Sequence, residues 1–517
     1  MLISRTCEAA IELLIYGMLV FTPWAFGTTE RWSVWATNIA GCGLGFLWLG
    51  VRWNWLRTGC RRSTEIDQVQ LGRGKGWGRF STVLLAGLTI SLLGYTFISA
   101  ANARATFLPN ERRFDYHQCI DWLPHSLDSN STWRAFWTYI SLGCLFWVAR
   151  DWLSGQTSAE QKARRGSGVE GLSTPLPARL KRLLWVLAIN GALLALEGIV
   201  QRQSGCPKLL FLVQPAIHHN AESQFGPFAY RANAAQYFNL LWPACLGFWW
   251  ALQTELPRHA RHHWQAGCVL VMAACPFLST SRGGALVAFG LMFALSAIFL
   301  TRFATWTFPH PFTRRPSMAI LALVTTGAPL LGMALGWHAL GPRWGSLKQS
   351  YEERERAYTL ARRIAYDYPA YGTGPGTYEV VSELYRPNET EFWPAQVHND
   401  WLETRITFGV VGSAMVGLTV LLILSRLLCA GVLPGGNVLS LSLWLGLVGC
   451  LVHARFDFPF QIYSILSLFV VLTAVLFAVT SPNPNPRGGR SDELAESFHS
   501  GTGPILRHAR PDQAWRA

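Results

Sequence analysis

The sequence predicts an all-α membrane protein with about twelve transmembrane helices, and three observations support this. Only 14% of the 517 residues are charged, whereas a soluble protein carries roughly 25%. Apolar runs of about 20 residues, the length that crosses a bilayer, recur along the chain. The 24 Trp and 29 Phe are typical of side chains that contact lipid and its interfaces.

Each long apolar run is assigned to one span. The expected spans are 9–27, 33–51, 81–100, 132–149, 183–201, 233–252, 265–279, 284–300, 318–336, 408–428, 439–456 and 461–480. They divide the chain into N-terminal spans (1–200), central spans (201–336), a large and partly helical loop (337–407), C-terminal spans (408–480) and a disordered tail (481–517).

The loops on one side of the spans are richer in Lys and Arg than in acids. They are 57–79, 149–182, 257–264, 301–315 and the tail. The positive-inside rule places this side and both termini in the cytoplasm, so the 337–407 loop lies outside. The net charge of +14 is thereby explained by topology, and no nucleic-acid partner is expected.

The eleven Cys show no metal-ligand spacing, and most of them lie in apolar runs as buried thiols. Cys119 and Cys206 fall in outer loops, which leaves a disulfide open. The adjacent His218 and His219, with Glu222, lack a third strong ligand nearby in the sequence, so no metal site is expected.

The 337–407 loop contains a predicted helix and a glycine-rich turn. Ser350 and Glu353 form a capping box, and the helix should end before Pro369. The turn at 371–378 alternates Gly372, Gly374 and Gly376. It either exposes backbone N–H groups to an anion or is a tight structural turn.

His398 stands where the next helix begins, near Asn399 or Asp400. A helix N-terminus disfavours imidazolium, and a neutral His is suited to act as a general base. Arg405 lies seven residues further along the same helix face. The alternative is that His398 is a helix cap or a hydrogen-bonded interfacial histidine.

Several other polar residues stand at the outer ends of spans. Arg282 offers a planar fork for phosphate, or alternatively reaches to lipid headgroups. Arg231 supplies a second cation before the sixth span. Arg455 and Asp457 form a candidate ion pair, for which a structural role is expected. Glu197, inside the fifth span, is a functional candidate because ionisable groups are costly there.

Four motifs occur in an order that resembles a family of bacterial membrane glycosyltransferases. They are SRGG (281–284), YGTGPGTY (371–378), HNDWLETRITFGVVG (398–412) and HARFDFPFQ (453–461). With the long outer loop before the last three spans, they resemble the O-antigen ligase and polymerase family over residues 225–480. One departure stands before the sixth span, where YRAN (230–233) replaces the family's usual Asn-Pro-Asn.

The resemblance implies a polytopic helical bundle in the bacterial cytoplasmic membrane, with its active face in the periplasm. The donor would be a glycan on undecaprenyl diphosphate and the acceptor a glycan, a lipid or a protein, with no cofactor and no metal. By motif, His398 and Arg282 would be catalytic. The substrate-binding residues would be Arg231, Arg356, Gly372, Gly374, Gly376, Asn399 and Arg405.

The function that the resemblance implies is transfer to an acceptor hydroxyl, as in an O-antigen ligase. A repeat-unit polymerase and a protein O-oligosaccharyltransferase carry the same motifs and stay open. A transporter would need ionisable residues deep inside several spans, and Glu197 is the clearest of the few. A scaffold without chemistry would not need the cluster of motifs.

Overall fold

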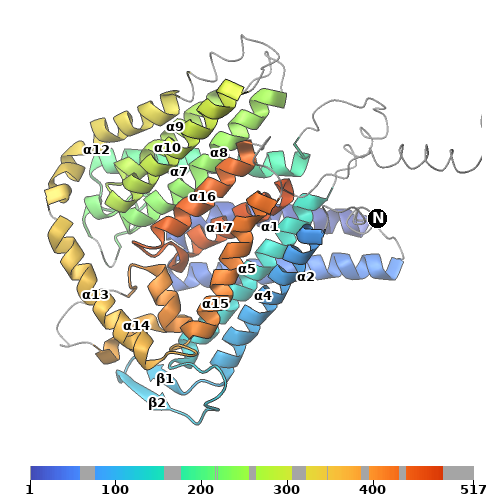
Figure 1. Ribbon diagram of the computed structural model, residues 1–517, viewed down its shortest axis with the longest axis vertical. Helices are drawn as coiled ribbons and strands as arrows, with labels where there is room; N and C mark the ends of the chain where they lie inside the picture. The colour runs from blue at the N-terminus through green and yellow to red at the C-terminus, as the bar shows by residue number, and fades with distance from the viewer. Residues whose placement is uncertain are drawn as a thin grey trace, which may run out of the picture.

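The computed structural model describes residues 2–58, 76–155, 176–215, 217, 219–255, 263–305, 319, 322–345, 347–385, 395–429 and 438–480. The protein is all-α and polytopic, as predicted (Figure 1). Its helices are α1 (Leu2–Trp24), α2 (Arg31–Thr58), α4 (Gly76–Ala101), α5 (Ser129–Ser154), α7 (Ala178–Ser204), α8 (Arg231–Glu255), α9 (Trp264–Leu278), α10 (Arg282–Thr305), α12 (Ala328–Gly345), α13 (Leu347–Asp367), α14 (Tyr378–Val381), α15 (Asp400–Cys429), α16 (Val438–His453) and α17 (Tyr463–Val479).

Every predicted span overlaps one of these helices, and the span predicted at 318–336 does so only from Ala328, after a π-helical turn at Leu323–Gly327. Within the described ranges, six helices are long and apolar enough to cross a membrane, on α1, α2, α4, α7, α10 and α15. Shorter apolar helices lie on α9, α12, α16 and α17. The remaining two predicted spans lie on α5 and α8. These helices are 26 and 25 residues long but carry charged or polar side chains.

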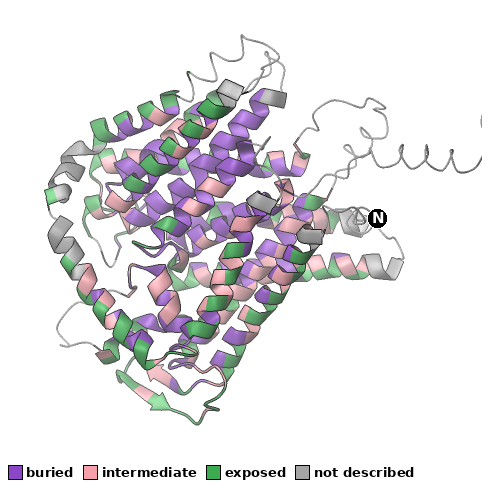
Figure 2. Ribbon diagram, viewed as in Figure 1, coloured by how far each residue is buried: buried purple, intermediate pink, exposed green. Residues whose placement is uncertain are grey.

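Helix α8 lies at the centre of the bundle and packs against α16, α9, α10 and α17. Its residues from Ala232 to Gln253 are all buried (Figure 2). Trp242 and Trp249 are among the largest fully buried side chains of the protein. A helix that is covered on every side belongs in the interior of a large bundle. Its inward polar residues therefore need partners inside the protein.

A small hairpin interrupts the helical pattern between α4 and α5. Strand β1 (Ala105–Leu108) pairs antiparallel with β2 (Arg113–Tyr116), and Ala105 faces Tyr116. The hydropathy pattern does not predict it because both strands are short. The hairpin leaves the all-α class unchanged.

The segment between α12 and α15 is more helical than predicted. Helix α12 continues to Gly345, so its last residues take in part of the expected loop. The predicted start of the next helix at Ser350 is wrong, because α13 begins at Leu347. Its end at Asp367, before Pro369, is confirmed. Buried α13 residues such as Ala361 and Ile364 share a second hydrophobic cluster with Ile406 of α15.

The glycine-rich turn connects this segment to a break in α15. The N–H groups of Thr373 and Gly374 donate to the carbonyl oxygens of Ile406 (2.9 Å) and Thr407 (3.0 Å). Gly409 has a φ of +61° and a ψ of −163°, and Val410 N–H donates to Pro369 O at 3.0 Å. A glycine is needed at 409 because a Cβ there would collide with the Ala370 carbonyl group.

We expect Gly409→Ala to destabilise the protein by about 1–3 kcal/mol, because φ is positive and the added methyl group meets backbone. Gly417→Ala is the matched control in the same helix, since nothing lies within 4 Å of its new Cβ. Thermal unfolding in detergent, followed by tryptophan fluorescence, checks this. Equal melting temperatures for the two variants would contradict it.

Candidate functional site

His398 immediately precedes α15 and has a left-handed backbone, with a φ of +56°. Such a conformation is uncommon outside glycine and persists where the surroundings fix it. The Asn399 side chain accepts a hydrogen bond from Leu402 N–H (3.2 Å), and the Glu403 carboxylate accepts one from Val397 N–H (3.0 Å). These bonds cap the helix on both sides of His398. The helix start predicted near Asn399 or Asp400 is confirmed, and it lies at Asp400.

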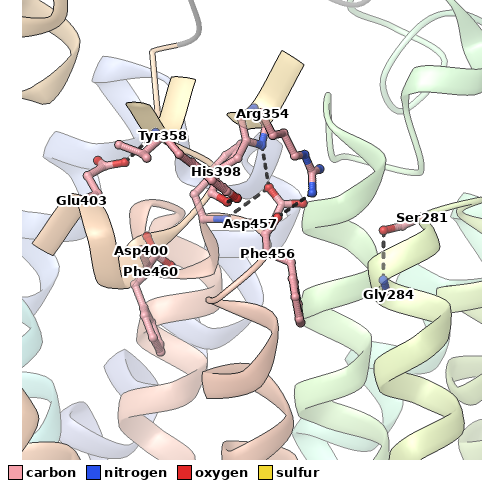
Figure 3. Close-up of polar contacts among 12 residues, drawn as sticks. Ser281, Gly284, Arg354, Tyr358, His398, Asp400, Glu403, Phe456, Asp457 and Phe460 are labelled. Carbon is pink, nitrogen blue, oxygen red and sulfur yellow. Dashed lines mark hydrogen bonds and ion pairs between the residues drawn. The ribbon is translucent and has the colours of Figure 1, made fainter. Parts of the chain in front are cut away.

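The imidazole of His398 pairs with Asp457, which lies in the turn between α16 and α17. Nδ1 of His398 is 3.0 Å from Oδ1 of Asp457 (Figure 3). Burial raises the pKa of the Asp457 carboxyl, but the hydrogen bond and charge of His398 hold this pKa below its usual range. The carboxylate is therefore ionised near neutral pH and accepts a hydrogen from Nδ1. In the neutral imidazole this leaves the lone pair on Nε2.

Aromatic side chains hold this pair from several directions. The rings of Phe458 and Tyr230 lie edge-on to the imidazole, with centroids at 4.8 and 5.9 Å, and they stack on each other at 5.5 Å. The Tyr358 hydroxyl of α13 donates to the His398 carbonyl oxygen at 3.0 Å. His398 keeps 23% of its side chain exposed while Asp457 keeps 5%, so a substrate can approach only the histidine.

Asp400 fastens the α16–α17 turn to the start of α15. Its carboxylate accepts hydrogen bonds from Phe460 N–H (2.8 Å) and Gln461 Nε2 (3.1 Å). Its own N–H donates to the Ala454 carbonyl oxygen at 2.9 Å. The distance between His398 and Asp457 is thus set by a network that spans both elements.

Two arginines lie beside the pair. Arg354 of α13 donates from Nη1 to the Phe456 carbonyl oxygen at 3.0 Å, and its charge helps to lower the pKa of the Asp457 carboxyl. Arg282 begins α10 near Tyr230, and it lies close enough to Arg354 for the two guanidinium charges to repel each other. A bound anion would relieve this repulsion. His398 and Arg282, which were predicted from separate motifs, thus both have Tyr230 in their surroundings.

The other predicted substrate-binding residues have varied surroundings. Arg231 donates to the Glu222 carbonyl oxygen at 2.9 Å, and Arg405 donates to that of Pro369 at 3.1 Å. Arg356 is exposed on α13, two residues from Arg354. Their predicted roles in substrate binding stay predictions.

The glycines of the turn differ in their exposure. Gly372 and Gly374 are buried, whereas Gly376 is exposed. The bonds from Thr373 and Gly374 to α15 fit the structural interpretation of this turn, because two of its N–H groups already have protein acceptors. Anion binding by these glycines stays a prediction.

The expected pairing of Arg455 with Asp457 is wrong. Asp457 pairs with His398, and Arg455 is exposed. Asp457, Arg354, Tyr230 and Tyr358 were not predicted as site residues. The motif HARFDFPFQ was the only available signal for Asp457, because 59 residues separate it from its partner.

Three further predictions concern cysteines, metal and Glu197. Cys119 and Cys206 are both free thiols. Over the described part of the chain, no group of three or more His, Cys, Asp or Glu could hold a metal ion; His218 lies outside the described residues. Both carboxylate oxygens of Glu197 on α7 are buried without a hydrogen-bond partner among the described residues.

The comparisons with known proteins bear on the segment that carries most of this site. No curated protein matches the chain. The model of the O-antigen ligase family matches residues 267–417, which contain Arg282, Arg354 and His398. Over residues 267–417 the chain is therefore similar to the O-antigen ligase family, the family that its motifs predicted.

Proposed function

We propose that the protein transfers a glycan from an undecaprenyl-diphosphate-linked donor to an acceptor hydroxyl at the periplasmic face of a bacterial cytoplasmic membrane. The family match supports a ligase- or polymerase-type enzyme in general. The observation that carries the finer proposal is the His398–Asp457 pair beside Arg282 and Arg354. A general base and two cations near the start of α10 and the end of α16 would suit transfer from a lipid diphosphate.

In this proposal His398 is the general base. Its Nε2 takes the proton of the acceptor hydroxyl while the acceptor oxygen attacks the anomeric carbon of the donor. Asp457 holds the imidazole in the tautomer that leaves Nε2 free to accept, and it stabilises the imidazolium that forms. Its burial makes this charge interaction stronger than it would be in water.

The leaving group is the lipid diphosphate. As the acceptor oxygen bonds to the anomeric carbon, the bond from that carbon to the diphosphate oxygen breaks, and its electron pair leaves with the diphosphate. Arg282 and Arg354 would stabilise the added negative charge. Attack from the side opposite the leaving group inverts the configuration at the anomeric carbon.

The proposed transfer uses no metal, because a diphosphate is already a good leaving group and arginines supply the countercharge. We expect turnover of the purified protein to change less than about twofold when EDTA is added, since no step depends on a metal ion. A loss of activity with EDTA that Mg²⁺ or Mn²⁺ restores would contradict this part of the proposal.

Arg354→Ala should lower kcat/KM by about tenfold or more, because its guanidinium lies beside Asp457 and Arg282. Arg356→Ala is the matched comparison on the same helix, where the side chain is exposed. The two variants decide between the contact seen at Arg354 and the sequence-based assignment to Arg356. A larger loss of kcat/KM in Arg356→Ala would show that Arg356, and not Arg354, is the cation that binds the donor.

The three related reactions differ in the acceptor that receives the glycan. A ligase transfers to a separate glycan or lipid, a polymerase to another lipid-linked repeat, and a protein O-oligosaccharyltransferase to a side-chain hydroxyl. Purified protein in liposomes, supplied with a lipid-diphosphate-linked repeat and each acceptor in turn, tests the proposal. A product that needs an added acceptor identifies a ligase, and a ladder without one identifies a polymerase.

A further inference from the structure

A group of polar side chains lies buried where α8, α10 and α16 meet. Asn233, Gln236 and His453 are 5%, 1% and 1% exposed. Oδ1 of Asn233, both polar atoms of the Gln236 amide and both ring nitrogens of His453 have no hydrogen-bond partner among the described residues. Buried polar atoms are nearly always hydrogen-bonded, and those without protein partners usually bind ordered water.

The packing of α8 on α16 brings these three side chains to one place. Gly247 packs against Leu439 and Ser442, and Gly446 packs against Leu240 and Pro243, so the two helices run antiparallel in a fixed register. Gln236 and Asn233 lie four and seven residues before Leu240, on the same face of α8. His453 lies seven residues after Gly446, on the matching face of α16. The register therefore makes the three side chains neighbours.

The first turn of α10 closes the third side of this group. A Cβ at Gly283 would lie 3.3 Å from Nε2 of His453, so the imidazole faces the turn that carries Arg282. Asn239 Nδ2 donates to the Gly284 carbonyl oxygen at 2.8 Å, which holds α10 against α8. The group thus lies next to the turn of α10 that carries Arg282, one of the candidate site residues.

His453 is also joined to the histidine–aspartate pair. Its carbonyl oxygen accepts hydrogen bonds from Asp457 N–H (3.1 Å) and Phe456 N–H (2.9 Å). A shift of His453 would therefore move Asp457 and the carbonyl that Arg354 contacts. The His453 ring thus contacts the turn that carries Arg282, and the His453 carbonyl oxygen contacts the turn that carries Asp457.

We propose that Asn233, Gln236 and His453 form a buried water-binding site, and that His453 is a positioning residue for the His398–Asp457 pair. The amides and the imidazole offer donors and acceptors together, which suits water better than an ion of either sign. The bound water would join the start of α10 to the end of α16. The positioning role rests on the proposed function, whereas the water site does not.

X-ray footprinting tests the water site without any activity measurement. Hydroxyl radicals formed from a bound water oxidise the side chains beside it, so His453 should be oxidised although it is 1% exposed. Met272 on α9 is the control, because it is intrinsically reactive and 0% exposed. Gln236→Leu should reduce the oxidation of His453. An unmodified His453, or oxidation of Met272 to the same extent, would overturn the water site.

The positioning role predicts a loss of turnover that is larger than the loss of stability. His453→Leu removes the imidazole and its hydrogen bonds to the bound water, so the melting temperature should fall modestly. The same variant should lower kcat by about tenfold or more with KM for the donor within about threefold, because a small displacement of reacting groups is costly. His453→Gln, which still hydrogen-bonds, should recover most of the turnover.

A change in KM as large as the change in kcat, or no recovery of turnover in His453→Gln, would make His453 merely structural, and full turnover in His453→Leu would remove its positioning role. If wild-type protein transfers no glycan, or if His398→Ala transfers as well as wild type, the proposed function fails. The footprint of His453 still decides the water site in that case. The two failures are therefore distinguishable.

Discussion

Replacing His398 by alanine should lower the rate of glycan transfer by about 10²–10⁴-fold, the contribution of a positioned general base. The reason is geometric. Asp457 holds Nδ1 at 3.0 Å, and 23% of the side chain is exposed, so Nε2 is the nitrogen that can meet an acceptor hydroxyl. No other described histidine has a carboxylate at hydrogen-bond distance.

The measurement is single-turnover transfer by purified protein, with His117→Ala as the matched control. His117 is an exposed histidine that contacts the Thr106 hydroxyl at 2.9 Å, and its loss should change the rate less than about twofold. The melting temperature of His398→Ala shows whether the protein is folded. If folded His398→Ala transfers glycan as fast as wild type, His398 is not the general base.

Asp457→Asn should lower kcat by about 10²-fold or more and leave KM for the donor nearly unchanged, because the carboxylate acts on the imidazolium that forms during reaction. The asparagine keeps the size of the side chain and can still accept from Nδ1. What it removes is the negative charge. Steady-state kinetics of folded protein measure the effect, and a rise in KM with constant kcat would mean that Asp457 only supports donor binding.

The same variant has a consequence for stability that depends on pH. Because the pKa of Asp457 is lowered in the folded protein, its pairing stabilises the fold at pH values above its unfolded pKa of about 4. This contribution is lost as the pH falls through the lower, folded pKa. The difference in melting temperature between wild type and Asp457→Asn should therefore be larger at neutral pH than below about pH 4. A difference that grows on acidification would contradict the pairing.

The helices could be predicted from the sequence because hydropathy alone decides where apolar runs lie. The expected spans coincide with helices even for α5 and α8, whose polar residues lower their hydropathy. The end of α12 could not be placed, since its continuation to Gly345 passes through Gly341 and Pro342, which ordinarily mark the end of a helix. The hairpin of β1 and β2 is too short to show a period.

Only part of the candidate site could be predicted from the sequence. His398 and Arg282 stand in recognisable motifs, but Asp457 lies 59 residues from its partner, and contact at that separation depends on how α15, α16 and α17 pack. Arg354 and Arg356 are equally plausible by composition. They lie on different faces of α13, and only tertiary packing decides which face meets the Phe456 turn.

Glycan transfer by the purified protein in liposomes tests the central claim most directly. Wild type and His398→Ala would be given a lipid-diphosphate-linked repeat, with and without glycan, lipid and protein acceptors. The account predicts a lengthened or transferred glycan with wild type and almost none with His398→Ala. Folded wild-type protein that yields no product with any of these acceptors would contradict it.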